Sequence, residues 1–154
     1  DIHDHKRATA LEVGADLYIN AATQSLRDEL EKNLGLKEVH VIVDCTGSKK
    51  AIEDSLQLLS GIGRFVMLGH PKPGESIEIK NANHFFEGEG KLLRATQGGR
   101  FSPTRDIPRY VALHRNGRLN IDKIITHRYK LHEINEAIDQ VRKGNASRIL
   151  IEMQ

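Results

Sequence analysis

The 154-residue sequence has a single cysteine, Cys45, so no disulfide bond can form within the chain. Its longest apolar runs, such as Phe65–Leu68, are far shorter than the roughly 20 residues that a membrane-spanning helix needs. The first residues do not have the charged and then apolar layout of a signal peptide. The net charge of +2 is small and evenly spread, which argues against a nucleic-acid ligand. These absences predict a cytoplasmic protein without membrane or nucleic-acid partners.

The glycine-rich loop that cradles the phosphates of a dinucleotide is also missing from the sequence. Such a loop follows a strand, whereas Gly61-Ile62-Gly63 is expected to precede one. Gly88-Glu89-Gly90 has no third glycine and no parallel strand before it. The phosphate-binding fingerprint is therefore absent from this chain.

No catalytic residue and no metal site can be assigned from the sequence alone. His3 and His5 lie beside acidic residues and could hold a divalent ion. Because residues two apart near a helix start point in different directions, we favour a solvated helix cap there. Cys45 has no cysteine partner and no adjacent base, so a small residue buried at a strand end is the preferred interpretation.

The distribution of apolar residues predicts an α/β protein. The shares of hydrophobic residues, 38%, and charged residues, 29%, are ordinary for a globular domain. The first half alternates between strands, expected at 16–20, 39–43 and 64–69, and helices, expected at 6–14, 23–34 and 49–60. Thr23 is expected to cap the second helix and Gly35 to end it, Gly47-Ser48 is expected to cap the third, and Gly61-Ile62-Gly63 is expected to form a turn. That alternation predicts parallel βαβ units. Val39–Val43 is nearly all β-branched, which suits a strand buried on both faces.

The second half is less regular. Ser76–Lys80 alternates apolar and polar residues, which predicts a half-exposed strand after the break at Pro71–Gly74. Further strands are expected at 92–96, 124–131 and 148–153, and further helices at 103–116 and 132–143. Ligands of a parallel sheet bind at the carboxyl ends of its strands, here Asp1, Asp44–Gly47 and Leu68–His70. Glycines at such positions also occur in ordinary turns, so this pattern alone assigns no ligand.

Several segments, in this order, resemble one known family, the medium-chain zinc alcohol dehydrogenases. They are Asp1–Ala8, Glu12–Asp16 with Ile19 and Asn20, Asp44–Gly47, Gly63–Gly69, Gly98–Arg100 with Asp106–Pro108, Ile125–Leu131, Ile134–Ala137, Gly144 and Arg148. The resemblance implies a partial doubly wound Rossmann-type parallel sheet, followed by a C-terminal α+β segment. Residues 1–100 would form a partial NAD-binding domain without its first strand, and residues 101–154 would include the return to the catalytic domain. Since the family's zinc ligands and proton relay precede these segments, we expect a C-terminal fragment of a longer enzyme, with zinc held outside this chain.

The resemblance also implies residues that bind NAD. Asp1 would accept hydrogen bonds from the adenosine ribose and repel the extra phosphate of NADP, and Lys6 would reach the same ribose. Arg148 would reach the pyrophosphate, although its position alone suggests a surface residue at the start of an edge strand. The other contacts would lie on the adenine side, at Cys45 and Thr46, and near the nicotinamide, at Leu68, Gly69, His70, Ala95, Thr96 and Gln97.

Three functions remain open at this point. The first is part of an NAD-dependent alcohol or polyol dehydrogenase with an alcohol or aldehyde substrate, inactive as this chain alone. The second is a zinc-free quinone or enoyl reductase of the same superfamily, which usually takes NADP, so Asp1 argues against it. The third is a non-catalytic oligomerisation module, because the family often pairs subunits through the strand corresponding to Ser76–Lys80. Binding of a nicotinamide cofactor separates the first two from the third.

The implied strand order predicts two incomplete pairings. In a doubly wound sheet of order 3-2-1-4-5-6, the strands at 16–20 and 39–43 would each lose a neighbour if Asp1 ends the second strand. We therefore expect residues 16–20 either to pair abnormally or to depend on another chain. We also expect Val39–Val43 to lie on an exposed edge or to be completed by a partner.

Overall fold

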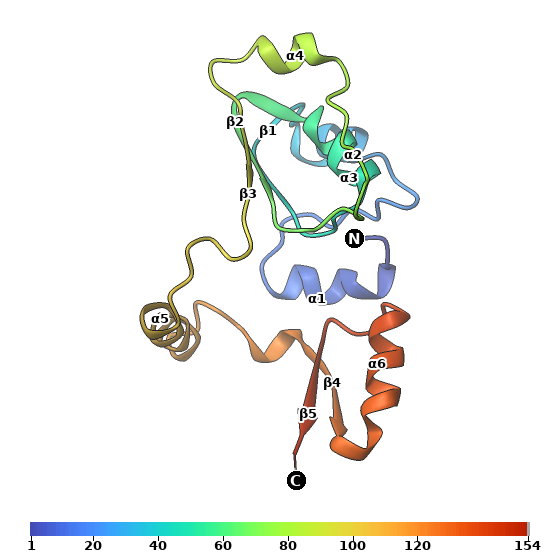
Figure 1. Cartoon of the computed structure of the whole chain (residues 1–154), viewed down its shortest axis with the longest axis vertical. Helices are drawn as coiled ribbons and strands as arrows, with labels where there is room; N and C mark the ends of the chain where they lie inside the picture. The colour runs from blue at the N-terminus through green and yellow to red at the C-terminus, as the bar shows by residue number, and fades with distance from the viewer. Residues whose placement is uncertain (154) are drawn as a thin grey trace. The chain divides into compact units, whose positions relative to one another are not determined.

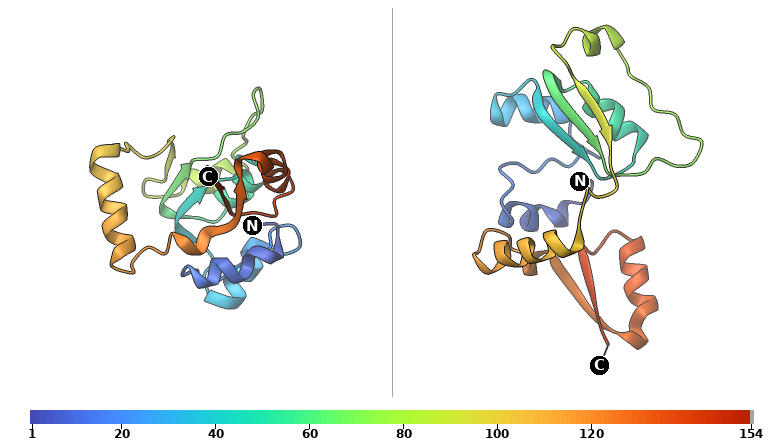
Figure 2. Two further views of the ribbon diagram at one scale, coloured as in Figure 1. Left: turned by 90° about the horizontal axis from the view of Figure 1, so that it is seen from below. Right: turned by 60° about the vertical axis from the view of Figure 1, so that its left-hand side comes forward.

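The computed structural model describes residues 1–153, which fall into two compact units. One unit is Ser25–Phe101, and the other combines Asp1–Gln24 with the residues from Ser102 onward. Each unit has a parallel sheet with helices of its own (Figures 1 and 2).

The unit Ser25–Phe101 is built on three parallel strands in the order β1-β2-β3. These are β1 (Val39–Asp44), β2 (Leu59–Met67) and β3 (Leu92–Ala95). Helix α3 (Lys49–Leu56) joins β1 to β2, as a βαβ unit requires. The right-hand view of Figure 2 shows the strands side by side. The α/β class and the parallel sheet predicted from the sequence are confirmed.

One apolar cluster holds this unit together. Ile52 and Leu56 come from α3, one helical turn apart, and Leu59 and Phe65 come from β2. All four side chains are fully buried. The spacing of four residues sets both helix side chains on the same face, so α3 covers the sheet and fixes where β1 and β2 end.

Ser48 begins α3, as the sequence predicts, and its side chain accepts a hydrogen bond from the backbone N–H of Ala51. Replacing Ser48 by alanine leaves that N–H without its acceptor. We expect Ser48→Ala to lower the free energy of unfolding by about 1 kcal/mol, measured by urea denaturation. Lys50→Ala, two residues after the cap at a side chain that is 85% exposed, is the control. Equal stability of the two variants would show that the cap does not support the helix.

Three local predictions in this unit are wrong. Helix α2 (Leu26–Leu34) begins after Ser25 rather than Thr23, because the Ser25 hydroxyl accepts the N–H of Asp28. Strand β2 begins at Leu59, so Gly61-Ile62-Gly63 lies within the strand and not in a turn. Helix α3 ends at Leu56, because the apolar residues after it already belong to the strand. Helix α4 (Ala82–Phe86) was not predicted.

Strand β1 lies at the edge of the sheet, which confirms the expected open edge. The expectation that it is buried on both faces is wrong: Val41 is 60% exposed and Val43 is 52% exposed. Ile42, between them, points to the other face and packs against the buried cluster, so β1 is covered on one face within this unit and Val41 and Val43 are accessible on the other. Ser76–Lys80 is a further correction, since it forms no strand with the described residues.

The second unit contains another βαβ arrangement. Strands β4 (Ile125–Lys130) and β5 (Arg148–Glu152) are parallel and are joined by α6 (Ile134–Arg142), as predicted. Ala137 of α6 is buried. Helix α5 (Pro103–Arg115) precedes them and also agrees with the sequence.

Residues 16–20 form no regular strand in this unit, so that prediction is wrong. The backbone nitrogen of Asp1 instead donates to the carbonyl of Ile19 at 3.3 Å, and the N–H of Ala21 donates to the carbonyl of Asp1 at 2.9 Å. Two such bonds are one step of a parallel ladder. Within the described residues, the backbone pairing of this segment is thus limited to one ladder step with Asp1 at its carboxyl end. Helix α1 (Arg7–Glu12) follows Asp1.

Candidate functional site

A pocket of about 350 Å³ opens at the carboxyl ends of β2 and β3. The two strands are adjacent and parallel, with Met67 beside Ala95, and the N–H of Thr96 donates to the carbonyl of Met67 at 3.0 Å. Their ends therefore meet at the same edge of the sheet. The lining residues are Met67, Leu68, Gly69, His70, Pro71, Ile77, Ala95, Thr96 and Gln97. All six residues that the sequence analysis assigned to the nicotinamide side thus lie around one cavity.

Asp44, at the end of β1, organises the turns beside this pocket. Its carboxylate is buried, and one oxygen accepts the N–H and the hydroxyl of Thr46 at 3.1 and 2.6 Å. The other oxygen accepts the N–H of Gly47 at 3.0 Å. The backbone carbonyl of Asp44 accepts the N–H groups of Leu68 and Gly69 at 2.8 and 3.0 Å. The sequence placed Asp44 at a strand end without assigning it a contact, although an aspartate can accept the backbone N–H two residues on and so form a turn.

Gly47 and Gly69 let the turns after β1 and β2 touch. A Cβ at Gly69 would lie 2.1 Å from the backbone nitrogen of Gly47, and a Cβ at Gly47 would lie 2.4 Å from the carbonyl oxygen of His70. The contact brings Thr46 and His70 to the same second cavity, of about 600 Å³. Cys45 is exposed, so the expectation that it is buried at a strand end is wrong, and it lines neither of these two cavities.

The loop after β3 is held by Thr96. Its hydroxyl oxygen accepts the N–H groups of Gly98 at 3.3 Å and Gly99 at 2.7 Å. This side chain thus turns the backbone at the mouth of the 350 Å³ pocket, while Ala95 and Gln97 line the cavity on either side of it.

Asp1 and Lys6 form a separate polar group in the other unit. One carboxylate oxygen of Asp1 accepts the N–H groups of Ile2 and His3 at 2.7 and 3.1 Å, and the other accepts the Lys6 ammonium at 3.1 Å. The Asp1 side chain remains 37% exposed. An ionised carboxylate has room for about four donors, so Asp1 can still accept one from a ligand. Arg148 begins β5, and its side chain is exposed.

The described residues do not fit a zinc site. Among residues 1–153, no three histidine, cysteine, aspartate or glutamate side chains gather to hold a metal ion. His3 and His5 stack loosely, with ring centroids 5.4 Å apart.

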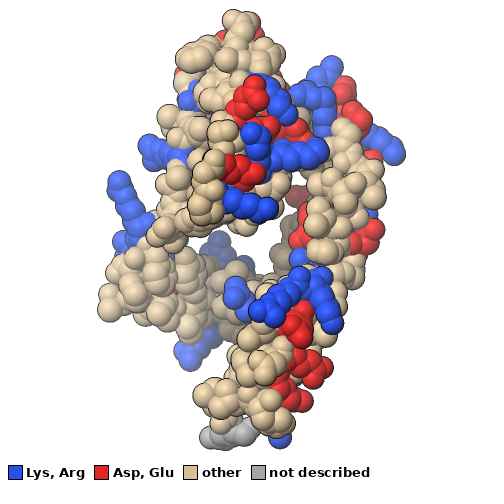
Figure 3. All heavy atoms as spheres, turned by 45° about the vertical axis from the view of Figure 1, so that its right-hand side comes forward, with Lys and Arg blue, Asp and Glu red and all other residues tan. Residues whose placement is uncertain are grey.

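No helix in this part of the chain has the length and apolar character to cross a bilayer. On the face in Figure 3, basic and acidic side chains are interspersed.

Comparison with known proteins connects this geometry to a family. Residues 1–115 match a family model described as zinc-binding dehydrogenase. An Arabidopsis thaliana protein, alcohol dehydrogenase-like 4, is 30% identical over 156 residues, covering 99% of this chain and 40% of that protein. The crystal structure of an alcohol dehydrogenase zinc-binding domain protein from Burkholderia ambifaria is 27% identical with a TM-score of 0.90, covering 100% of this chain and 40% of its own. The chain spans about 40% of the length of the curated relatives that it matches.

Two further structures of similar fold contain nicotinamide cofactors. An alcohol dehydrogenase from E. coli CFT073, solved with NADH, is 17% identical with a TM-score of 0.77 and covers 99% of this chain and 43% of its own. A zinc-binding dehydrogenase from Sinorhizobium meliloti 1021, solved with NADP, is 24% identical with a TM-score of 0.79 and covers 99% and 44%. At these identities the likeness shows the shared Rossmann-type fold alone.

Proposed function

Since this chain belongs to the zinc-binding dehydrogenase family, we propose that it supplies cofactor contacts to an NAD-dependent alcohol or polyol dehydrogenase. One observation carries the proposal: residues from the ends of two parallel strands surround a single pocket at the edge of the sheet where such folds bind their ligands. The substrate would be an alcohol or the corresponding aldehyde. A cytoplasmic location, which the single cysteine favours, stays a prediction.

The pocket walls suit a flat ring that carries an amide group. Leu68 and Ala95 offer apolar surface, and Thr96 and Gln97 offer a hydroxyl and an amide close by. Such a combination of apolar walls with a few polar groups is typical of small-molecule sites. When bound, NAD supplies the nicotinamide ring that accepts a hydride. The role of these residues is to orient the ring and keep water from it.

Asp1 and Lys6 offer the complementary chemistry for a ribose. The carboxylate can accept a hydrogen bond from one hydroxyl, and the ammonium can donate to the oxygen of the neighbouring hydroxyl. We further propose that Arg148 binds phosphate oxygens and that Cys45 and Thr46 contact the adenine. The division into a cofactor-binding part, 1–100, and a C-terminal segment, 101–154, belongs to the same proposal.

Filling the 350 Å³ pocket tests the proposed nicotinamide site. Ala95 lines the pocket, whereas Arg94 precedes it on the opposite face of β3. We expect Ala95→Trp to raise the dissociation constant of NAD at least tenfold, about 1.4 kcal/mol, because the indole occupies the space of the ring. Isothermal titration calorimetry measures the change, with Arg94→Trp as the matched control. If the two variants bind NAD equally well, the ring lies elsewhere.

The Ser76–Lys80 segment supports a second part of the proposal, the pairing of two copies of this chain. Within the described residues, the backbone N–H and C=O groups of Ile77 and Ile79 make no hydrogen bond. A free backbone edge of this kind pairs readily with another strand. Glu78 and Lys80 give the segment charges of both signs, so two antiparallel copies can set opposite charges across from each other. Such a contact is symmetric and closes as a dimer.

A further inference from the structure

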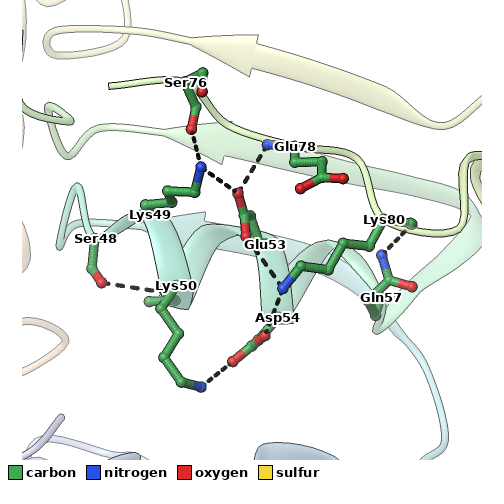
Figure 4. A network of polar contacts seen from close by, with 10 residues as sticks. Ser48, Lys49, Lys50, Glu53, Asp54, Gln57, Ser76, Glu78 and Lys80 are labelled. Carbon is green, nitrogen blue, oxygen red and sulfur yellow. Dashed lines mark hydrogen bonds and ion pairs between the residues drawn. The ribbon is translucent and has the colours of Figure 1, made fainter. Parts of the chain in front are cut away.

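The Ser76–Lys80 segment is tied to α3 by side chains at regular intervals (Figure 4). The Lys49 ammonium donates to the carbonyl of Ser76 at 2.8 Å, and the N–H of Glu78 donates to the Glu53 carboxylate at 3.0 Å. The Gln57 amide then donates to the carbonyl of Lys80 at 2.6 Å. We call Lys49 and Glu53 of α3, together with its C-cap residue Gln57, the α3 row.

The contacts alternate along the segment, so they all lie on one of its edges. In an extended chain, successive residues direct their N–H and C=O groups to opposite edges. Ser76, Glu78 and Lys80 therefore face α3, and Ile77 and Ile79 turn their backbone groups the other way. The α3 row takes the place that a neighbouring strand would have.

The repeat distances of a helix and an extended chain explain why the side chains of the α3 row can take the place of a neighbouring strand. Residues four apart on a helix rise about 6 Å along its axis. Two residues of an extended strand span about 6.6 Å. Side chains at positions i, i+4 and i+8 of the α3 row therefore have nearly the same spacing as every second residue of the segment, over its whole length.

Glu53 is the centre of the row. Its side chain is only 5% exposed, yet its carboxylate lies within 3.4 Å of the Lys49 ammonium and 3.3 Å of the Lys80 ammonium. The hydrogen bond from the Glu78 backbone, together with Lys80 and Lys49, lowers the pKa of Glu53, although burial acts in the opposite direction. Glu53 thus places a fixed negative charge under the middle of the segment.

We propose that Glu53 is a positioning residue for self-association: the α3 row holds Ser76–Lys80 extended, with the Ile77 and Ile79 edge turned outward for a second copy of this chain. The inference rests on the pairing proposed above, and it adds the residues that hold the edge extended before a second copy binds. A loose segment would lose its conformational freedom on pairing, whereas the α3 row has already fixed it. Removing the charge of Glu53 weakens association without changing the edge itself.

The test compares Glu53→Gln with Asp54→Asn. Glutamine keeps the size of Glu53 but loses the attraction to Lys49 and Lys80. Asp54 is the neighbouring surface carboxylate, which contacts Lys50 and Lys80 without touching the segment's backbone. We expect Glu53→Gln to raise the dissociation constant of the dimer about tenfold, measured by analytical ultracentrifugation. The Glu78 amide should also exchange its hydrogen about ten times faster, and Asp54→Asn should change neither value beyond twofold.

The possible results distinguish the role of Glu53 from the pairing through Ser76–Lys80 itself. A wild-type protein that stays monomeric at all concentrations overturns the pairing itself. A wild-type dimer whose dissociation constant is unchanged in Glu53→Gln overturns the role of Glu53. Gln57→Ala, which removes only the donor to Lys80, gives a second variant outside the core and should weaken the dimer by a smaller factor. The midpoint of urea denaturation of each variant reports whether the fold is intact.

Discussion

Replacing Asp1 by serine is expected to weaken NAD binding relative to NADP by about 2 kcal/mol, roughly thirtyfold in the ratio of dissociation constants. Two effects act in the same direction. Serine loses the charged acceptor for the ribose hydroxyls, and it removes the negative charge that repels the extra phosphate of NADP. Lys6 then loses its partner at 3.1 Å and is free to attract that phosphate. Calorimetric titration with both cofactors measures the ratio.

The control for this experiment is Asp4→Ser. Asp4 lies close by in sequence, but its side chain is 71% exposed and contacts only the Arg7 guanidinium, at 3.7 Å. The same change of charge at that position should leave the ratio within twofold. Because the Asp1 carboxylate also accepts two backbone N–H groups, the melting temperature of each variant is measured in parallel. An unchanged cofactor ratio at equal stability would exclude Asp1 as the ribose ligand, and would favour the NADP-dependent reductase as the alternative.

The sequence predicted the elements whose signals are local. Ser48 and Gly35 mark helix ends with a side-chain acceptor and a left-handed residue, and both are confirmed. The parallel strand order followed from alternation of strands and helices, so the meeting of Leu68 with Ala95 around one pocket could be anticipated. The roles of these residues toward NAD stay predictions, because they come from the resemblance to a family.

The elements that were missed depend on distant partners. The apolar residues between Leu56 and Phe65 fit a helix or a strand equally well, so the start of β2 could not be placed by periodicity. Ser76–Lys80 has the alternation of a strand, but its hydrogen bonds go to helix side chains. The local sequence has no signal that these hydrogen bonds go to helix side chains and not to a neighbouring strand. The bonds of Asp44 to two turns likewise appear only once β1 and β2 are side by side.

Gly69→Ala is expected to lower the free energy of unfolding by about 3 kcal/mol, the upper range for a group forced into a filled site. The added Cβ would lie 2.1 Å from the nitrogen of Gly47 and 2.7 Å from the carboxylate of Asp44. Neither atom can retreat, because that nitrogen donates to Asp44, and Asp44 also holds Thr46. Relief therefore requires the turns after β1 and β2 to separate. Urea denaturation measures the loss.

Gly61→Ala is the matched control, since it adds the same methyl group within β2, where the nearest atom, the Cα of Gly88, would lie at an ordinary contact distance of 3.8 Å. We expect it to change stability by less than about 0.5 kcal/mol, within the usual range for sites without a clash. Separation of the turns also displaces Leu68 and His70 from the mouth of the pocket, so NAD binding should weaken in Gly69→Ala and persist in Gly61→Ala. Equal unfolding energies for the two variants would mean that the turns after β1 and β2 can move apart freely. In that case the 350 Å³ pocket would not be the rigid cradle on which the proposed cofactor site depends.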